Sequence, residues 1–397
     1  MSRDAKSSPG PSVGDPDDHE LITDAGSLDA FIEHAVAAPA YALDTEFHRE
    51  RTYYPALALI QIAVGERLVL IDPLAVDVTP LAALLDNDAT AIIHAARQDL
   101  EVLEHSVGLA PRRVFDTQLA AGFLGLATPS LTSLLERELK VRLPKADRLT
   151  DWLKRPLTAS QLRYAASDVA YLLELAERQA AEIESTGRRE WFDVAMADLL
   201  AEPRGARNPT DAWRRIKEVR HLRGTDLAVA QAIAAWRERR AQELDLTPRF
   251  VLSDLGVVGL AVAKPASIEQ IRDIRGVDAR SLRHVRDDLL AAIAEGREQA
   301  PVRDTASSAN EVPPSLKAAV PLIGAWAAHR ARELRIDPAL LATRSDLEAM
   351  LSGDADARLR RGWRYELLGS QIEQLLAGDM SLAFDARVGL LLERRGR

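Results

Sequence analysis

Residues 41–63, YALDTEFHRERTYYPALALIQIA, place two carboxylates inside an apolar, strand-like run. The run reaches Asp44, continues to a second acid at Glu46, and is followed by a further apolar alternation after residue 56. Side chains two apart in a strand point to the same face, so Asp44 and Glu46 should project together. Because an isolated Asp-x-Glu at a strand end is common in proteins without a metal, other acids must support any functional interpretation.

The composition is ordinary for a globular protein, and the absence of cysteine is compatible with a reducing compartment. The 397 residues are 47% hydrophobic and 28% charged, with a net charge of -9 and no cysteine. The missing cysteines exclude a disulfide framework, a thiolate zinc site and a cysteine nucleophile. The opening residues 1–20 are polar and rich in Ser, Pro, Gly and Asp, which predicts a disordered tail without a signal peptide. No uncharged apolar stretch reaches the roughly 18 residues of a membrane span, so we expect a cytoplasmic protein without a membrane partner.

The chain divides into one mixed region and two helical regions. Strand-like and helix-like segments alternate first, which predicts an α/β layer structure with a mixed sheet flanked by helices. Two segments rich in Pro, Gly and Asn or Ser then separate regions that contain only helical patterns, and few contacts should cross them. The expected boundaries are the α/β region 21–201, the linker 202–210, a helical domain 211–297, a linker 298–315, a second helical domain 316–385 and a tail 386–397.

An internal repeat relates the two helical regions. AWRERRAQELDLTP (235–248) and AWAAHRARELRIDP (325–338) share a tryptophan, an arginine, a Glu-Leu pair and a proline at one fixed offset. Two Ala-rich amphipathic helices can look alike by composition alone. The fixed offset of Trp236 and Trp326 from the prolines favours a duplication.

Two further acids lie on predicted helices. Asp99 follows a short apolar strand, where the positive end of a helix dipole alone would favour an acid. In residues 157–179, Thr158 and Gln161 form a capping-box pattern, so a helix should start near residue 159. Tyr164 and Asp168 are then four residues apart and share one face of that helix.

The order of these signals resembles the DEDD exonuclease superfamily in its tyrosine-bearing subgroup, most closely the ribonuclease D family. DTEFHRERTYYPALALIQI is similar to the first family motif, including its Arg49, Thr52, Tyr53, Pro55 and Gln61. HAARQDLEVL resembles the second motif, FDTQLAAGFLG the segment after it, and DWLKRPLTASQLRYAASDVAYLL the third. AWRRIKEVRHL, AWRERRAQELD and KPASIEQIRDIRGV resemble an HRDC domain, and the second helical region resembles a degenerate one. The resemblance implies a ribonuclease-H-like exonuclease core followed by two all-α HRDC-type domains.

The same resemblance implies an activity and a site. It implies a metal-dependent 3′-5′ exoribonuclease that trims tRNA precursors and other small structured RNAs, releases 5′-mononucleotides and needs no nucleotide cofactor. The metal ligands would be Asp44, Glu46, Asp99 and Asp168, which would hold two Mg²⁺ or Mn²⁺ ions. Tyr164 would orient the attacking water, and Thr45, Phe47 and His94 would contact the RNA 3′ end. For His94, a buried hydrogen-bonded histidine is the alternative.

Elementary electrostatics supports a cation at such a site. Two unit charges about 4 Å apart repel by about 4 kcal/mol at an effective dielectric constant of 20, so converging carboxylates must bind protons or cations. All-oxygen ligands suit Mg²⁺ or Mn²⁺, and two such ions can promote phosphoryl transfer. A 3′-5′ DNA exonuclease would use the same acids, and an RNA-binding protein without activity would have no need to keep all of them together with Tyr164.

Other polar residues have structural interpretations. We expect Asp116 to cap a helix or support the site, Asp72 to form a turn before a proline, and Asp151 to brace its loop. Arginines and lysines gather in residues 204–223 and 358–364. Such runs are usually solvated helix faces, but beside a nuclease core they favour phosphate binding.

Overall fold

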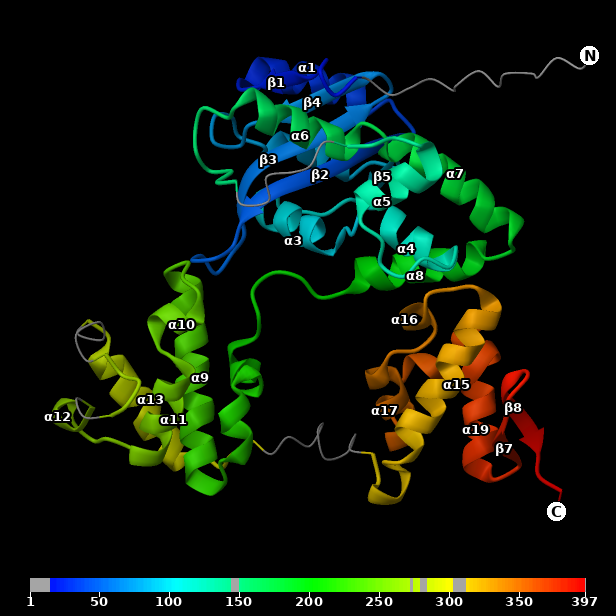
Figure 1. Ribbon diagram of the computed structural model, residues 1–397. Coiled ribbons are helices and arrows are strands. Elements are labelled where there is room, and N and C mark those ends of the chain that lie inside the picture. The colour runs from blue at the N-terminus through cyan, green and yellow to red at the C-terminus, as the bar shows by residue number, and fades with distance from the viewer. Residues whose placement is uncertain (1–14, 144–149, 272–273, 279–283, 303–311, 397) are drawn as a thin grey trace, which may run out of the picture.

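The fold is seen in a computed structural model that describes residues 15–143, 150–271, 274–278, 284–302 and 312–396 (Figure 1). Residues 1–14 of the predicted disordered tail lie outside the described residues, as do residues 303–311 of the second predicted linker. The end of the predicted tail is ordered, because Glu20 pairs with Val69 in a sheet.

Six strands form one mixed sheet in the order β1-β4-β3-β2-β5-β6. β3 runs antiparallel to both of its neighbours, and the other neighbouring pairs are parallel. The predicted mixed sheet is thereby confirmed. The strands are β1 (Glu20–Ile22), β2 (Ala40–His48), β3 (Ala56–Val64), β4 (Arg67–Ile71), β5 (Thr90–Ile93) and β6 (Val114–Asp116).

Both faces of the sheet are covered, which explains why β3 reads as a nearly continuous apolar run. Ala42 and Leu59 belong to an apolar cluster on one face, and Leu43 and Ile60 belong to a cluster on the other. The second face packs against α1 (Ala25–Ala35), η1 (Thr79–Leu81), α2 (Ala82–Leu85) and α3 (Arg97–Ser106). The first face packs against α4 (Thr117–Phe123), α5 (Leu131–Leu134), η2 (Leu135–Leu139), α6 (Ala159–Val169), α7 (Leu172–Ser185) and α8 (Arg189–Ala201).

A first helical module follows the sheet domain and has its own apolar cluster. Its long central helix buries Trp236 against the shorter helices around it. Its elements are η3 (Pro209–Arg215), η4 (Lys217–His221), α9 (Gly224–Glu243), α10 (Pro248–Val251), α11 (Asp254–Ala263), α12 (Ile268–Ile271) and α13 (Arg286–Glu298).

A second helical module repeats the course of the first. A long helix with a buried tryptophan leads to a short helix that begins with proline and then to a third helix, in α9-α10-α11 and again in α15-α16-α17. This shared course agrees with the predicted duplication. The helices are η5 (Pro314–Leu316), α15 (Ala319–Leu334), α16 (Pro338–Leu341), α17 (Arg344–Ser352), η6 (Arg358–Arg360), α18 (Gly362–Arg364), η7 (Tyr365–Gly369) and α19 (Ser370–Ala377).

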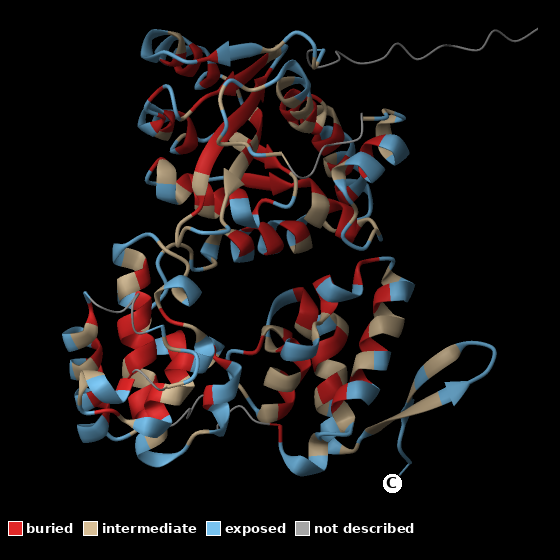
Figure 2. Cartoon of the chain, turned by 60° about the vertical axis from the view of Figure 1, so that its left-hand side comes forward, coloured by how far each residue is buried: buried red, intermediate tan, exposed pale blue. Residues whose placement is uncertain are grey.

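The chain ends in a β-hairpin, so the prediction of a helical domain followed by a tail is wrong at this end. β7 (Met380–Asp385) pairs with β8 (Gly389–Arg394) in an antiparallel register. Alternating apolar residues gave a strand signal that the helical pattern upstream obscured. Figure 2 shows the hairpin projecting from the second helical module with no buried residue.

The second helical module shares an apolar core with the sheet domain, contrary to the expectation of few contacts. Trp363 stacks on Trp191 with ring centroids 5.2 Å apart and meets Phe123 at 5.9 Å. The backbone N–H of Asp337 donates to the Gly122 carbonyl over 2.8 Å. The second helical module therefore packs directly on the sheet domain, although the first helical module separates the two in the sequence.

Truncating this shared core should destabilise the whole chain. We expect Trp363→Ala to lower the free energy of unfolding by about 3–5 kcal/mol, the range for large buried aromatic residues. Urea unfolding followed by far-UV circular dichroism would measure the change. Phe384→Ala is the control, because Phe384 is 77% exposed on the hairpin and should matter little. Equal, small effects of both changes would mean that the two parts are not energetically coupled.

Candidate active site

Three carboxylates converge between the sheet and helix α6. Strand β2 directs Asp44 and Glu46 to the face that α6 covers, and α6 brings Asp168 over them. One oxygen from each of the three side chains lies within 4.8 Å of the other two. The capping box of Thr158 and Gln161 starts α6 at Ala159, as predicted, and this fixes the helical phase that aims Asp168 at the strand.

Asp99 lies beside this cluster rather than within it. It occupies the first turn of α3 and is 5% exposed. Its carboxylate accepts hydrogen bonds from the backbone N–H of Thr45 (3.1 Å) and from the Thr45 hydroxyl (2.6 Å). Its charge raises the pKa values of Asp44 and Glu46. The structure therefore places all four predicted acids in one electrostatic neighbourhood and three of them at metal-ligand spacing.

Burial raises the pKa of every acid in this neighbourhood. For Asp44, burial and then the charges of Asp99, Asp168 and Glu46 hold the pKa well above its usual range. Burial and the charges of Asp168 and Asp99 raise the pKa of Glu46 to about 8. Burial raises the pKa of Asp99 and of Asp168 to about 7, against the opposing hydrogen bonds of Thr45 and Tyr164 respectively. At neutral pH some of these acids therefore hold protons, and a bound cation can take the place of those protons.

These pKa values predict how the metal-free protein responds to pH. Native carboxyls with raised pKa bind protons more tightly than the unfolded chain does, whose values are about 4. The free energy of unfolding in EDTA should therefore fall as the pH rises from about 4 to about 8. Thermal unfolding across this range is the measurement, with Asp168→Asn as the comparison, because it removes one repelling charge. A variant that loses stability as steeply as the wild type would contradict the assignment.

Tyr164 lies one helical turn before Asp168 and stays protonated. Burial, followed by the charges of Asp168, Glu46 and Asp44, raises the pKa of Tyr164 above its ordinary value. A protonated phenol donates a hydrogen bond and is no base at neutral pH. The ring centroids of Trp152 and Tyr164 lie 6.1 Å apart. Sequence reasoning missed Trp152, although it stands in the quoted motif DWLKRPL.

The loop that carries Trp152 is anchored by an ion pair that the sequence did not reveal. The Arg155 guanidinium donates to both oxygens of Asp72, over 2.6 and 2.7 Å, and to the Ala58 carbonyl. Burial raises the pKa of Asp72, but hydrogen bonds from Arg155 and Leu74 outweigh it and leave the pKa lowered. Asp72 does form the predicted turn by accepting from the Leu74 N–H, and it also holds this loop.

The three predicted substrate-binding residues lie in different settings. The Thr45 hydroxyl donates to Asp99, and Phe47 packs against the apolar cluster on the opposite face of the sheet. His94 Nδ1 lies 2.9 Å from the Thr117 hydroxyl, and burial lowers the pKa of the ring. This contact agrees with the alternative of a hydrogen-bonded histidine. Contact of these residues with RNA stays a prediction.

Two other acids have the structural roles predicted for them. Asp116 caps α4 by accepting from the backbone N–H groups of Gln118 and Leu119. Asp151 braces its loop by accepting from the Leu153 N–H.

The loop between β2 and β3 docks on the first helical module. Asp245 accepts hydrogen bonds from the backbone N–H groups of Tyr53 (3.0 Å) and Tyr54 (2.9 Å). The Tyr53 hydroxyl donates to the buried Glu238 over 2.6 Å. The Thr247 N–H donates to the Arg51 carbonyl. The segment that leaves the acid-bearing strand is thus held by side chains from α9 and the turn after it.

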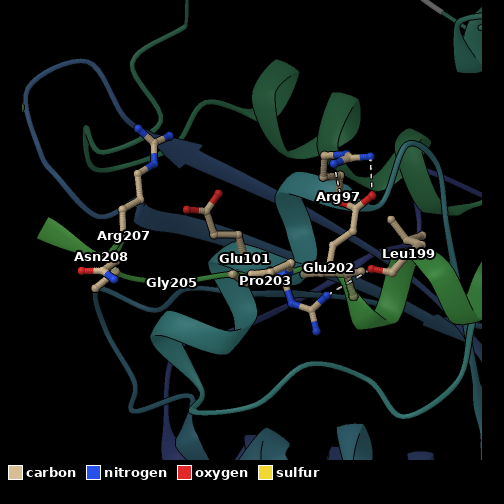
Figure 3. A pocket seen from close by; sticks show the side chains of 11 residues that line it. Arg97, Glu101, Leu199, Glu202, Pro203, Gly205, Arg207 and Asn208 are labelled. Atoms are coloured by element: carbon tan, nitrogen blue, oxygen red, sulfur yellow. Dashed lines mark hydrogen bonds and ion pairs between the residues drawn. The ribbon is translucent and has the colours of Figure 1, made fainter. Parts of the chain in front are cut away.

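The predicted linker 202–210 is pinned along α3 and borders a cavity of about 280 Å³. Figure 3 shows Arg97 joined to Glu202 at one end of this cavity and Arg207 at the other. Arg204 pairs with Glu104 over 2.7 Å. The linker is therefore an ordered connection, and it places the arginine side chains Arg204 and Arg207 beside α3, the helix of Asp99.

Several arginines in each of the two basic runs are paired with acids, among them Arg204, Arg214 and Arg215 of the first run. Arg358 and Arg360 pair with Asp346 and Glu373 inside the second helical module, and Arg364 is buried against Trp363. Lys217 and Arg220 are exposed on η4 of the first module.

Comparisons with known proteins agree with this architecture. Residues 19–184 match a family described as 3′-5′ exonuclease, and residues 226–293 match the HRDC domain. A ribonuclease D of Sphingobium indicum is 33% identical over 92% of this chain and 96% of its own length. A ribonuclease D of Jannaschia sp. is 35% identical over 91% of this chain and 96% of its own. The crystal structure of Escherichia coli RNase D superposes with a TM-score of 0.81 at 33% identity, covering 91% of this chain and 99% of that one.

The comparisons confirm the exonuclease core and the HRDC resemblance of the first helical region, whereas the HRDC-like character of the second region stays a prediction. Among the described residues, none of the helices has both the length and the apolar character needed to cross a membrane. The acid cluster, the mixed sheet and the near-complete overlap with these relatives lead to one conclusion: the chain belongs to the ribonuclease D family and is a 3′-5′ exoribonuclease acting on nucleic acid.

Proposed function

We propose that this enzyme hydrolyses RNA with two divalent cations, Mg²⁺ or Mn²⁺, trims the 3′ ends of tRNA precursors and other small structured RNAs in the cytoplasm, and releases 5′-mononucleotides. The observation that carries the proposal is the convergence of Asp44, Glu46 and Asp168 within 4.8 Å. The E. coli relative is described as an exoribonuclease involved in structured RNA processing, and its similarity to this chain supports the substrate class.

The residues present fit a hard divalent cation. Their donor atoms are carboxylate oxygens, which Mg²⁺ and Mn²⁺ prefer, and no thiolate ligand is available in a chain without cysteine. Burial and mutual repulsion raise the pKa values of these acids, so cation binding would relieve an unfavourable charge cluster. Asp44, Glu46 and Asp168 would hold the cations. Asp99 would add a further negative charge that attracts them.

Each side chain then has a distinct task. When bound, the cations supply an activated water and neutralise charge on the scissile phosphate. The protonated Tyr164 hydroxyl would donate a hydrogen bond that orients the attacking oxygen, because its raised pKa prevents it from acting as a base. Trp152, beside Tyr164, would offer an aromatic face to a terminal base.

The first helical module would hold the RNA by its phosphates. Lys217 and Arg220 are exposed cations on η4, in the module that also fixes the β2–β3 loop. Contacts of this kind need no base-specific recognition, which suits an enzyme that removes nucleotides one after another.

Removing the two basic side chains Lys217 and Arg220 should change the salt dependence of RNA binding. Each phosphate contact to a single strand contributes about -0.7 to the slope of log affinity against log salt, so Lys217→Ala with Arg220→Ala should make the slope shallower by about 1.4. Fluorescence anisotropy with a 3′-tailed hairpin RNA would measure it. The control removes Arg189 and Arg344 together, because each is exposed and already paired within its helix. An unchanged slope in the first double variant would remove η4 from the RNA path.

One assay tests the proposed reaction. Matched hairpins with a 3′ single-stranded tail of RNA or DNA are digested with Mg²⁺, with Mn²⁺ or with EDTA, and the products are identified by mass. We expect 5′-mononucleotides from the RNA tail and none in EDTA. Preferential digestion of the DNA tail would make the enzyme a DNA exonuclease, and full activity in EDTA would overturn the metal dependence.

A further inference from the structure

Gln61 is a fully buried amide without a hydrogen-bond partner among the described residues. Its exposed fraction is 0%, and neither its Nε2 nor its Oε1 makes a hydrogen bond there. It lies in the middle of β3, a strand whose other residues are all apolar. A buried polar group without a partner costs about 1–3 kcal/mol, so an apolar side chain would be more stable at this position.

The position of Gln61 connects it to the acid cluster. In the antiparallel pairing of β2 and β3, Gln61 stands directly opposite Asp44. Directly opposed residues on neighbouring strands share a face, with their Cβ atoms about 4.5–5.5 Å apart. Leu59 and Ala63, which flank Gln61 on the same side of β3, belong to the apolar cluster under α6. The amide is therefore confined between the sheet and α6, next to Asp44.

We infer that Gln61 is a positioning residue for Asp44. Its Nε2–H donates to one carboxylate oxygen of Asp44 in the cation-loaded site and leaves the other oxygen for the cation. This bond gives the buried amide the partner that it otherwise lacks, and it fixes one rotamer of Asp44. The inference rests on the proposed metal-dependent function and adds a residue outside the carboxylate set.

Tyr41 provides a matched control on the same sheet. Its side chain is also 0% exposed, and its hydroxyl also has no partner among the described residues. It lies on β2 three residues before Asp44, but it belongs to the apolar cluster on the opposite face. Tyr41→Phe removes an unpartnered polar atom from the core without touching the acid side of the sheet.

The experiment measures Mn²⁺ affinity by electron paramagnetic resonance, without RNA, for the wild type, Gln61→Met and Tyr41→Phe. Thermal unfolding in EDTA is recorded for the same proteins, and Gln61→Leu replaces the methionine variant if the latter does not fold. We expect Gln61→Met to keep or gain stability in EDTA and to bind Mn²⁺ about 10–100-fold more weakly, the usual cost of losing a hydrogen bond to a metal ligand. Tyr41→Phe should keep the wild-type Mn²⁺ affinity.

The outcomes separate this inference from the proposed function. Wild-type Mn²⁺ affinity in a folded Gln61→Met variant overturns the role of Gln61 and leaves the proposed function standing. Equal weakening by Tyr41→Phe also overturns it, because the effect would then belong to the core in general. A wild-type protein that binds no Mn²⁺ overturns both.

Discussion

Asp44→Asn should lower RNA hydrolysis at saturating Mg²⁺ by about 10³-fold or more, while the metal-free protein keeps or gains thermal stability. Cation stabilisation of a phosphoryl transition state amounts to several kcal/mol, and each 1.4 kcal/mol is a factor of ten in rate. Stability should not suffer, because in the metal-free site this carboxylate is repelled by its neighbours. Single-turnover rates and thermal unfolding in EDTA are the two measurements.

Asp72→Asn is the matched control for the stability effect. Asp72 is a buried aspartate of the same domain, but it is paired with Arg155, and its pKa is lowered rather than raised. A lowered pKa contributes stability that is present above the unfolded value of about 4, so this variant should unfold more easily at neutral pH. Activity of Asp44→Asn within tenfold of the wild type would remove Asp44 from the site.

Tyr164→Phe and Asp168→Asn should fail in different ways although the two residues are one helical turn apart. Asp168 belongs to the carboxylate cluster, so its replacement should weaken Mn²⁺ binding and reduce turnover severely. Tyr164 is assigned only a hydrogen bond to the attacking water, so Tyr164→Phe should leave Mn²⁺ and RNA affinity nearly unchanged. Its turnover should fall by about 10²–10⁴-fold, the range for a positioned proton-transfer or hydrogen-bonding group.

Mn²⁺ and RNA titrations alongside single-turnover rates distinguish these cases. Full turnover of Tyr164→Phe would make the tyrosine a packing residue. If it lost Mn²⁺ as badly as Asp168→Asn does, the phenol would be holding the cluster together and the division of roles would be wrong.

The sequence predicted the acid-bearing elements because their signals are local. The two-residue period of β2, the capping box of α6 and the four-residue spacing of Tyr164 and Asp168 each follow from backbone geometry. These rules fix which side of an element a residue occupies. They do not fix which neighbour it meets, so Asp99 was assigned as a ligand without its hydrogen bonds to Thr45 being foreseen.

The features that the sequence did not reveal depend on contacts between distant segments. Arg155 and Asp72 are 83 residues apart, and nothing in either local pattern marks them as partners. The docking of Trp363 against Trp191 likewise joins distant segments, and neither local pattern marks the partner. Composition described the linker 202–210 correctly as mostly irregular, but irregular backbone can still be held in place by side chains such as Arg204.

The docked loop between β2 and β3 limits how members of this family can be recombined. Asp245 and Thr247 of the first helical module bind the backbone of residues 51–54, directly after the strand of Asp44 and Glu46. In a chimera that exchanges this module between relatives, the backbone bonds need a carboxylate at the position of Asp245, and the bond to Glu238 needs Tyr53 in the loop. The loop and the module must therefore match each other, although the chain places about 190 residues between them.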